Sequence, residues 1–230
     1  MPDLREIAPG VVQVFVLGVA VTVIRDGDQA VLIDGGMRSS VPDVLGVLNR
    51  IPGKRPVSHI LVTHAHPDHA WGLAELQAAT NAVVAAHQAE VAILQGTQSW
   101  PSPFAFPVLR DLSVPRGWSP QPVAIDLVLE HGSLVDASGG IDVLHTPGHT
   151  PGSVCYFFRR TGLLYVGDAL QYPNGRLTSP SRVFTRDMAG ATQSIARLAA
   201  IEPETIAFSH YPPITHQASA ALKDFAASVA

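Results

Sequence analysis

The sequence predicts an α+β fold, and three observations lead to that prediction. Short apolar runs rich in β-branched residues recur along the chain, and each is bounded by Gly, Pro or Asp, as strands are. The C-terminal part instead carries apolar residues at helical spacing. The two halves also echo each other, because in each of them one apolar run ends in Asp and a later one ends in His: AVLIDGG and ILVTHAH at residues 30–36 and 60–66, LLYVGDA and TIAFSHYP at residues 163–169 and 205–212. If the halves face each other, these strand ends meet at one edge.

Strands dominate the N-terminal part of the chain. Residues 11–24 are rich in Val and Ile, and a turn leads from them into a second strand over residues 30–33. Another strand ends at Val62, and Pro67 suits the first turn of a helix. The polar residues 63–69 (THAHPDH) are therefore expected to lie on a strand-to-helix loop.

The middle of the chain contains a segment without a regular pattern. A strand at residues 83–84 and a helix over residues 87–95 precede it. Prolines recur between residues 96 and 122 and prevent regular structure, and four aromatic side chains add bulk there: Trp100, Phe104, Phe106 and Trp118. We interpret residues 96–122 as a loop insertion that either covers an apolar substrate or packs as an extension of the core.

Strands return in the second half, and two helices end the chain. The predicted strands cover residues 125–129, 141–144, 154–158 and 163–166. Apolar stripes at helical spacing predict one helix near residues 188–198, behind a capping Asp187, and another near residues 218–229. No break in composition divides the chain, so we predict a single domain over residues 1–230.

Charge and composition exclude several classes of partner. The chain carries 15 Lys and Arg against 19 Asp and Glu, without a run of like charges, which argues against a nucleic-acid partner. The longest apolar stretch is interrupted by polar residues, and the N-terminus lacks a secretory pattern, so no membrane partner is expected. Cys155 is the only cysteine, which rules out a disulfide within the chain and fits the cytoplasm. The oligomeric state is left open.

The segment THAHPDH concentrates imidazole and carboxylate groups that a hydrophobic core does not satisfy, because buried ring nitrogens need partners. His64 and His66 alternate on an extended segment and point the same way, whereas Asp68 and His69 follow at the start of the helix. Such a cluster suits one or two divalent metal ions held by His and carboxylates alone. Further candidate ligands follow apolar strands: His149, Asp168 and His210. Histidines without this context, such as His131, are expected to do no metal chemistry.

Four motifs together resemble the metallo-β-lactamase superfamily in order and roughly in spacing: THAHPDH, HTPGHTPGS, GDA and SHY. The family motifs begin with an Asp after a strand, here Asp34, and the resemblance covers residues 30–210. It implies a four-layer αβ/βα sandwich with the metals at one edge of the paired sheets, in a small stand-alone metallo-hydrolase. By position it implies a first metal held by His64, His66 and His149, a second held by Asp68, His69 and His210, a bridging Asp168, and an Asp34 that orients a ligand from behind.

The chemistry of such a centre fits hydrolysis. Two divalent ions about 3.5–4 Å apart can hold a bridging hydroxide and polarise a carbonyl oxygen. We therefore expect a small-molecule substrate with an ester, lactone or thioester carbonyl, and two ions, Zn first, with Fe or Mn as alternatives. Asp68 has a second, catalytic role in this scheme, because it can orient the hydroxide or accept its proton.

Three alternatives remain open. A mono-iron enzyme similar to persulfide dioxygenases would use fewer of these ligands. A β-lactam hydrolase usually has a secretory signal, which this sequence lacks. A non-catalytic metal-binding protein would close its ligand shell, whereas a catalytic centre keeps one position open. Measuring the number and identity of the bound metals would distinguish these alternatives from a dinuclear hydrolase.

Overall fold

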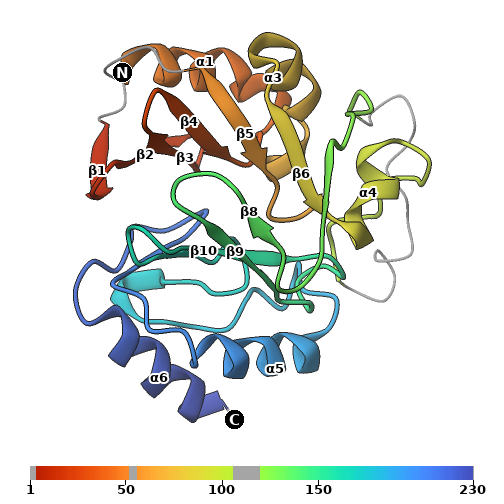
Figure 1. The fold of residues 1–230 in the computed structure, drawn as a ribbon. Helices are drawn as coiled ribbons and strands as arrows, with labels where there is room; N and C mark the ends of the chain where they lie inside the picture. Colours follow the sequence, from red (N-terminus) through yellow and green to blue (C-terminus); the bar gives the residue numbers. More distant parts are fainter. Residues whose placement is uncertain (1–3, 52–55, 106–119, 230) are drawn as a thin grey trace.

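Two β-sheets pack face to face, and helices cover the outer face of each sheet (Figure 1). The computed structural model describes residues 4–51, 56–105 and 120–229. The helices α1 and α3 lie above the first sheet, and α5 and α6 lie below the second. The predicted α+β, four-layer αβ/βα sandwich is thus confirmed. Within the described ranges, no helix has both the length and the apolar character needed to cross a membrane.

The first sheet is built by the N-terminal half and, in the part of the chain that the structure describes, has seven strands in sequence order. Its first four strands form an antiparallel meander, and its last four pair in parallel. The strands are β1 (Arg5–Ala8), β2 (Val11–Val16), β3 (Val19–Asp26), β4 (Gln29–Ile33), β5 (Val57–Leu61), β6 (Val83–His87) and β7 (Leu127–Leu129). The described helices of this half are α1 (Val41–Arg50), α2 (Pro67–Ala70), α3 (Leu73–Thr80) and α4 (Gln88–Leu94), with a 3-10 turn η1 (Arg38–Ser40).

The second sheet has five strands in the order β12-β11-β10-β9-β8. Of its described strand pairs, β11 and β12 run parallel and the other three are antiparallel. The strands are β8 (Leu134–Val135), β9 (Ile141–His145), β10 (Val154–Phe158), β11 (Leu163–Tyr165) and β12 (Thr205–Ala207). A 3-10 turn η3 (Pro173–Gly175) precedes the helices α5 (Met188–Leu198) and α6 (Ala218–Val229), whose bounds match the prediction. The predicted cap is also present, since Asp187 Oδ1 accepts a hydrogen bond of 3.0 Å from the Gly190 N–H.

Three hydrophobic layers separate the four structural layers, and strand periodicity explains them. Along β4, Leu32 packs toward the helices above, whereas Val31 and Ile33 pack into the space between the sheets. Along β11, Tyr165 faces the space between the sheets and Leu164 faces α5 and α6. Both strands are apolar on both faces because each lies between two other layers.

Two element predictions need correction. Residues 11–24 do not form one strand, because Leu17 and Gly18 adopt positive φ angles of 51° and 84° and form the tight turn between β2 and β3. The helix after Pro67 is two short helices, separated at Trp71 and Gly72. A Cβ at position 72 would lie 2.4 Å from the Gly35 carbonyl oxygen, so this close passage of two backbone segments requires glycine.

The internal echo corresponds to two equivalent parallel pairs. In the first half β4 runs parallel to β5, and in the second half β11 runs parallel to β12. Parallel strands present their carboxyl ends at the same edge, so Asp34 and His64 emerge together in one half, and Asp168 and His210 in the other. The fold thereby gathers polar side chains at one edge between the sheets.

Cys155 is fully buried in β10, where it packs as a small residue of the hydrophobic layer below the second sheet. Burial raises the pKa of its thiol to about 12, although the contact with the Thr146 hydroxyl opposes that rise. We therefore expect no reaction of the folded protein with a thiol reagent at pH 8, since the thiolate is the reactive form. Titration should detect one thiol per chain only after denaturation. A rapidly reacting thiol in the folded protein would contradict this packing.

Candidate metal centre

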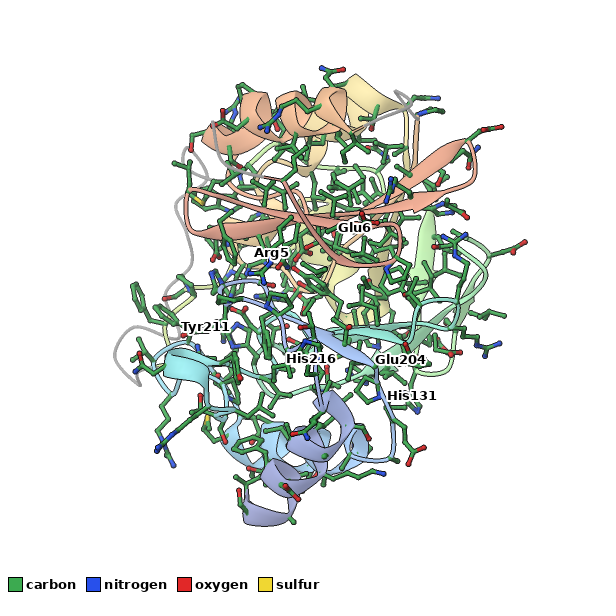
Figure 2. The ribbon with its side chains drawn as sticks, turned by 90° about the vertical axis from the view of Figure 1, so that its left-hand side faces the viewer. Arg5, Glu6, His131, Glu204, Tyr211 and His216 are labelled. Atoms are coloured by element: carbon green, nitrogen blue, oxygen red, sulfur yellow. The ribbon has the colours of Figure 1, made fainter. Side chains whose placement is uncertain are left out.

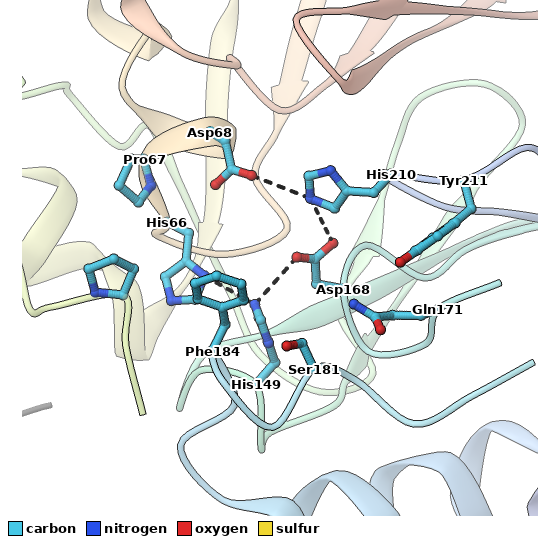
Figure 3. A pocket seen from close by; sticks show the side chains of 11 residues that line it. His66, Pro67, Asp68, His149, Asp168, Gln171, Ser181, Phe184, His210 and Tyr211 are labelled. Atoms are coloured by element: carbon cyan, nitrogen blue, oxygen red, sulfur yellow. Dashed lines mark hydrogen bonds and ion pairs between the residues drawn. The ribbon is translucent and has the colours of Figure 1, made fainter. Parts of the chain in front are cut away.

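All seven side chains that the sequence singled out as ligands meet at the edge between the sheets. Figure 3 shows those that line a pocket there, namely His66, Asp68, His149, Asp168 and His210. They come from five segments: the loop after β5, helix α2, the β9–β10 loop, and the residues that follow β11 and β12. The side chains are His64, His66, Asp68, His69, His149, Asp168 and His210.

The first group consists of three buried histidines, His64, His66 and His149. Each offers one ring nitrogen, and these nitrogens lie within 4.8 Å of one another. His149 Nε2 and His66 Nδ1 are 3.1 Å apart. His64 Nε2 is buried and has no hydrogen-bond partner. Three converging nitrogens of this kind could hold one metal ion.

The second group consists of Asp68, His69 and His210. Asp68 Oδ2 lies 3.6 Å from His69 Nε2 and 3.3 Å from His210 Nε2. Asp168 lies between the two groups. Its Oδ2 is 3.5 Å from His149 Nε2 and 3.7 Å from His69 Nε2, and its Oδ1 is 3.4 Å from His210 Nε2. The Asp168 carboxylate therefore faces both groups at once.

Hydrogen bonds on the far ring nitrogens orient four of the five histidines in the two groups. Asp34 Oδ2 is 2.8 Å from His69 Nδ1, and the Thr63 hydroxyl, itself bonded to Asp34, is 3.0 Å from His64 Nδ1. Beyond these, His149 Nδ1 lies 3.1 Å from the Thr185 hydroxyl, and His210 Nδ1 lies 3.2 Å from the Gly18 carbonyl oxygen. Such partners fix a ring and leave its other nitrogen free for a metal.

Burial keeps the first group neutral. It lowers the pKa of His64, His66 and His149, and the neighbouring imidazoles lower those of His64 and His66 further. The pKa of His66 falls to about 3. Because a histidine binds metal only in its neutral form, these three side chains are ready to do so at neutral pH.

The second group is strongly charged. Burial alone would raise the pKa values of Asp68 and Asp168, but His69 and the hydrogen bonds from His210 bring that of Asp68 to about 2 and hold that of Asp168 well below its usual range. Burial alone would lower the pKa of His210, but the two carboxylates raise it to about 10. The concentrated negative charge of two closely spaced, partly exposed carboxylates favours a cation here, whether a proton or a metal ion.

The arrangement fits divalent metal ions on two further grounds. His64 Nε2 and His69 Nε2 are buried without a hydrogen-bond partner, an unfavourable state that a metal ion would relieve. The contacts around Asp168 and Asp68 measure 3.3–3.7 Å, and tetrahedral zinc with bonds of about 2.0–2.2 Å separates its ligand atoms by about 3.3–3.6 Å. The His and Asp side chains are thus positioned to bind metal ions.

A cavity of about 370 Å³ opens onto these side chains. Its apolar wall includes Pro67, Pro103 and Phe184, and its neutral polar groups are Gln171, Ser181 and Tyr211 (Figure 3). In the view of Figure 2, Tyr211 lies on one side of the molecule and His131 on the other, so His131 is remote from this cavity.

The predicted aromatic loop residues are placed differently from one another. Trp100 is only 4% exposed, packs edge-on against Trp71 and belongs to the hydrophobic layer above the first sheet, not to the cavity. Phe104 is 40% exposed, follows the cavity residue Pro103 in the chain, and contacts Phe184 with ring centres 5.6 Å apart. Phe106 and Trp118 lie outside the described residues.

Sequence reasoning missed several residues around the centre. Phe184 and Thr185 come from a stretch without strand or helix periodicity, so no pattern indicated them. Tyr211 directly follows His210, and its position beside a candidate ligand was a usable signal. Glu90 lies in helix α4 and is almost fully buried, although nothing in the sequence distinguishes it from a solvent-facing acid.

Comparisons with known proteins agree with this geometry. The family model described as the metallo-beta-lactamase superfamily matches residues 14–210. A hydroxyacylglutathione hydrolase of Cereibacter sphaeroides is 31% identical over 75% of this chain and 53% of its own length. An acyl-coenzyme A thioesterase of Gallus gallus is 31% identical over 64% of this chain and 56% of its own. The match thus spans little more than half the length of these curated relatives.

A solved structure shows the same fold. The subclass B3 metallo-beta-lactamase of Bradyrhizobium japonicum superimposes with a TM-score of 0.75 over 99% of this chain and 90% of its own, at 19% sequence identity. With the family model matching most of the chain, these comparisons establish membership: the chain belongs to the metallo-β-lactamase superfamily.

Proposed function

We propose that the protein is a dinuclear metal-dependent hydrolase that acts on the carbonyl group of a small-molecule ester, lactone or thioester. The position of Asp168 is the observation that carries this proposal, because one carboxylate faces both the three-histidine group and the Asp68, His69 and His210 group. We assign the first ion to His64, His66 and His149, the second to Asp68, His69 and His210, and the bridge to Asp168. Zinc suits this mixture of imidazole and carboxylate ligands, and Fe or Mn could replace it.

When bound, two divalent ions supply an activated water and a Lewis acid for the carbonyl oxygen. The chain's own groups hold and orient the reactants. Asp68 lines the cavity as a carboxylate, so it can orient the attacking water and accept its proton. Tyr211 and Gln171 line the same cavity and can donate hydrogen bonds to the substrate. Asp34 does not line the cavity, but it orients His69 through the contact with His69 Nδ1.

The cavity favours a neutral substrate with an apolar acyl group. Phe184, Pro103 and Pro67 offer apolar surface beside the ligands, while Gln171 and Ser181 are uncharged. The two relatives named above are an acyl-coenzyme A thioesterase and a hydroxyacylglutathione hydrolase, and their names support testing a thioester first among the three carbonyl classes. The charge balance and the single cysteine remain our reasons to propose no nucleic-acid partner and a cytoplasmic location.

The decisive experiment combines metal analysis with a substrate panel. The purified protein should contain two zinc-like ions per chain and hydrolyse at least one class among thioesters, esters and lactones, with loss of activity on chelation and recovery on zinc addition. One ferrous ion with oxygen consumption on persulfides would favour the mono-iron alternative. If the protein binds two ions but hydrolyses none of these substrate classes, the non-catalytic metal-binding alternative is favoured and the proposal is contradicted.

Phe184 provides a test of the apolar acyl subsite. We expect Phe184→Ala to raise the KM for long acyl chains much more than that for short ones, because the lost apolar contact grows with chain length. Burial of a Phe side chain is worth about 1.5–3 kcal/mol, so the KM for the long substrate should rise about tenfold or more. KM measurements with an acyl series provide the check. Phe15, similarly exposed but absent from the cavity wall, gives the matched control Phe15→Ala. Equal changes for all chain lengths would contradict the subsite.

A further inference from the structure

Glu90 is a buried carboxylate that joins the two loops carrying the first metal group. It lies in the first turn of α4, directly after β6, and is almost fully buried. Its Oε1 accepts hydrogen bonds from the Thr150 hydroxyl at 2.6 Å and from the Gly152 N–H at 2.8 Å. The backbone N–H of Ala65 also hydrogen-bonds to this carboxylate. A buried carboxylate is unfavourable unless its oxygens are satisfied, and these donors satisfy it.

The partners of Glu90 are neighbours of proposed ligands on both sides. Ala65 lies between His64 and His66, and Thr150 directly follows His149. Glu90 itself belongs to neither loop, so it acts as a common anchor for the two. One step farther from the centre, the Val154 N–H donates to the Thr63 carbonyl oxygen at 3.0 Å and joins the same two segments through the backbone.

Close packing around Glu90 makes this anchor rigid. A Cβ at position 152 would lie 2.5 Å from Glu90 Cγ, so only glycine lets the β9–β10 loop approach the carboxylate this closely. The Ser153 hydroxyl lies 2.9 Å from the Thr150 hydroxyl and accepts a hydrogen bond from the Thr150 N–H. These contacts hold the Thr150 hydroxyl in place, and this hydroxyl makes the 2.6 Å hydrogen bond to Glu90. Ser153 therefore fixes the Thr150 donor, and the glycine at position 152 lets its own N–H come close to Glu90 Oε1.

We propose that Glu90 is a positioning residue that fixes the distance between the His64–His66 pair and His149, and so prepares the first metal group before the ion binds. This inference rests on the proposed function, because it assumes that these histidines bind metal. Residues that orient ligands without touching the metal typically change metal affinity or activity by about 10–100-fold when substituted.

The test compares Glu90→Gln and Glu90→Ala with a matched control. Glutamine keeps the size and one acceptor oxygen but turns an NH₂ group toward a donor, whereas alanine removes all acceptors. Asp26 provides the control, because its carboxylate also joins the two halves by accepting the Ser138 N–H at 2.6 Å, far along the chain from any proposed ligand. Asp26→Asn therefore removes a similar charge and a similar link without touching the ligand loops.

Three quantities should be measured for each variant: zinc affinity by chelator competition, the absorption spectrum of the cobalt-loaded protein, and the melting temperature of the metal-free protein. We expect Glu90→Gln to weaken binding of the ion held by His64, His66 and His149 by about 10–100-fold and to alter the cobalt spectrum. Glu90→Ala should have a larger effect on both. Asp26→Asn should lower the melting temperature while leaving affinity and spectrum unchanged.

Each contrary outcome has a distinct meaning. If both Glu90 variants retain wild-type affinity and the wild-type spectrum, the positioning role is overturned, even if their melting temperatures fall. If Glu90→Ala does not fold, the Glu90→Gln data alone decide between these outcomes. If the wild-type protein itself binds no metal, the proposed function is overturned and this inference falls with it.

Discussion

Asp168→Ala should abolish hydrolysis and remove more bound metal than any other single ligand substitution. Among the described residues, its carboxylate is the one group with a contact to each of His149, His69 and His210, so its loss affects both proposed ions. Metal ions contribute several kcal/mol to transition-state stabilisation, and the rate should therefore fall by about a thousandfold or more. His66→Ala should have a comparable effect on the rate by opening the first group. Steady-state kinetics and metal content per chain provide the measurements.

Controls separate this result from a general loss of structure. Asp142→Ala removes a carboxylate that pairs with Arg159 on the surface, and it should leave the rate unchanged. Asp68→Ala should retain more metal than Asp168→Ala, because Asp68 faces only the second group. The fold of each variant should persist, since the hydrophobic layers do not include the ligands. Wild-type turnover by both Asp168→Ala and His66→Ala in the presence of a chelator would overturn the metal-hydrolase proposal.

Asp34→Asn should weaken metal binding by about 10–100-fold without direct contact to a metal. Asp34 accepts hydrogen bonds from the Thr63 N–H at 2.6 Å and the Thr63 hydroxyl at 2.8 Å, and it is paired with His69 Nδ1. Asparagine keeps one acceptor oxygen but turns an NH₂ group toward a donor on the other side, so the three hydrogen bonds that orient Thr63 and His69 cannot all be retained. Because Asp34 has φ 60° and Asn adopts this conformation readily, the exchange adds no backbone strain. Cobalt or zinc titration should detect the loss chiefly in the second ion.

The matched control for Asp34 is Asn81→Asp. Asn81 also has a left-handed conformation, with φ 56°, but it ends helix α3 away from the ligands. The same pair of residue types is thereby exchanged in the reverse direction at a comparable backbone geometry. Unchanged metal affinity in both variants would show that Asp34 serves the backbone alone.

The ends of the strands that carry the proposed ligands were predictable, because a polar Asp or His follows an apolar run at each of them. Apolar runs stop at Asp34, His64, Asp168 and His210, and parallel pairing brings those stops to one edge. The turn at Leu17 was not predictable from composition, since an apolar side chain at a turn extends the apparent strand. The Leu17 residue is 66% exposed, and this exposure becomes visible only in the folded structure.

Roles that depend on tertiary contacts were also hidden. Trp100 is an aromatic residue in a proline-rich segment, which is typical of a substrate contact. In the structure it packs against Trp71 and belongs to a hydrophobic layer. Glu90 resembled an ordinary helix acid, because the donors that surround it come from segments far away in the sequence. Phe184 reaches the cavity from a loop whose path no local pattern encodes.

The seam between the two sheets gives the proposed centre a consequence for the lifetime of the protein. Each group of ligands draws on both halves of the chain, so an ion can bind fully only when the sheets are docked. Binding at a hundredfold excess over the dissociation constant stabilises a folded state by about 2.7 kcal/mol per site. That is a sizeable share of the roughly 5–15 kcal/mol that keeps a typical domain folded. A cell starved of the metal would therefore lose the protein itself to proteolysis, and not only its catalysis, so abundance would follow metal supply.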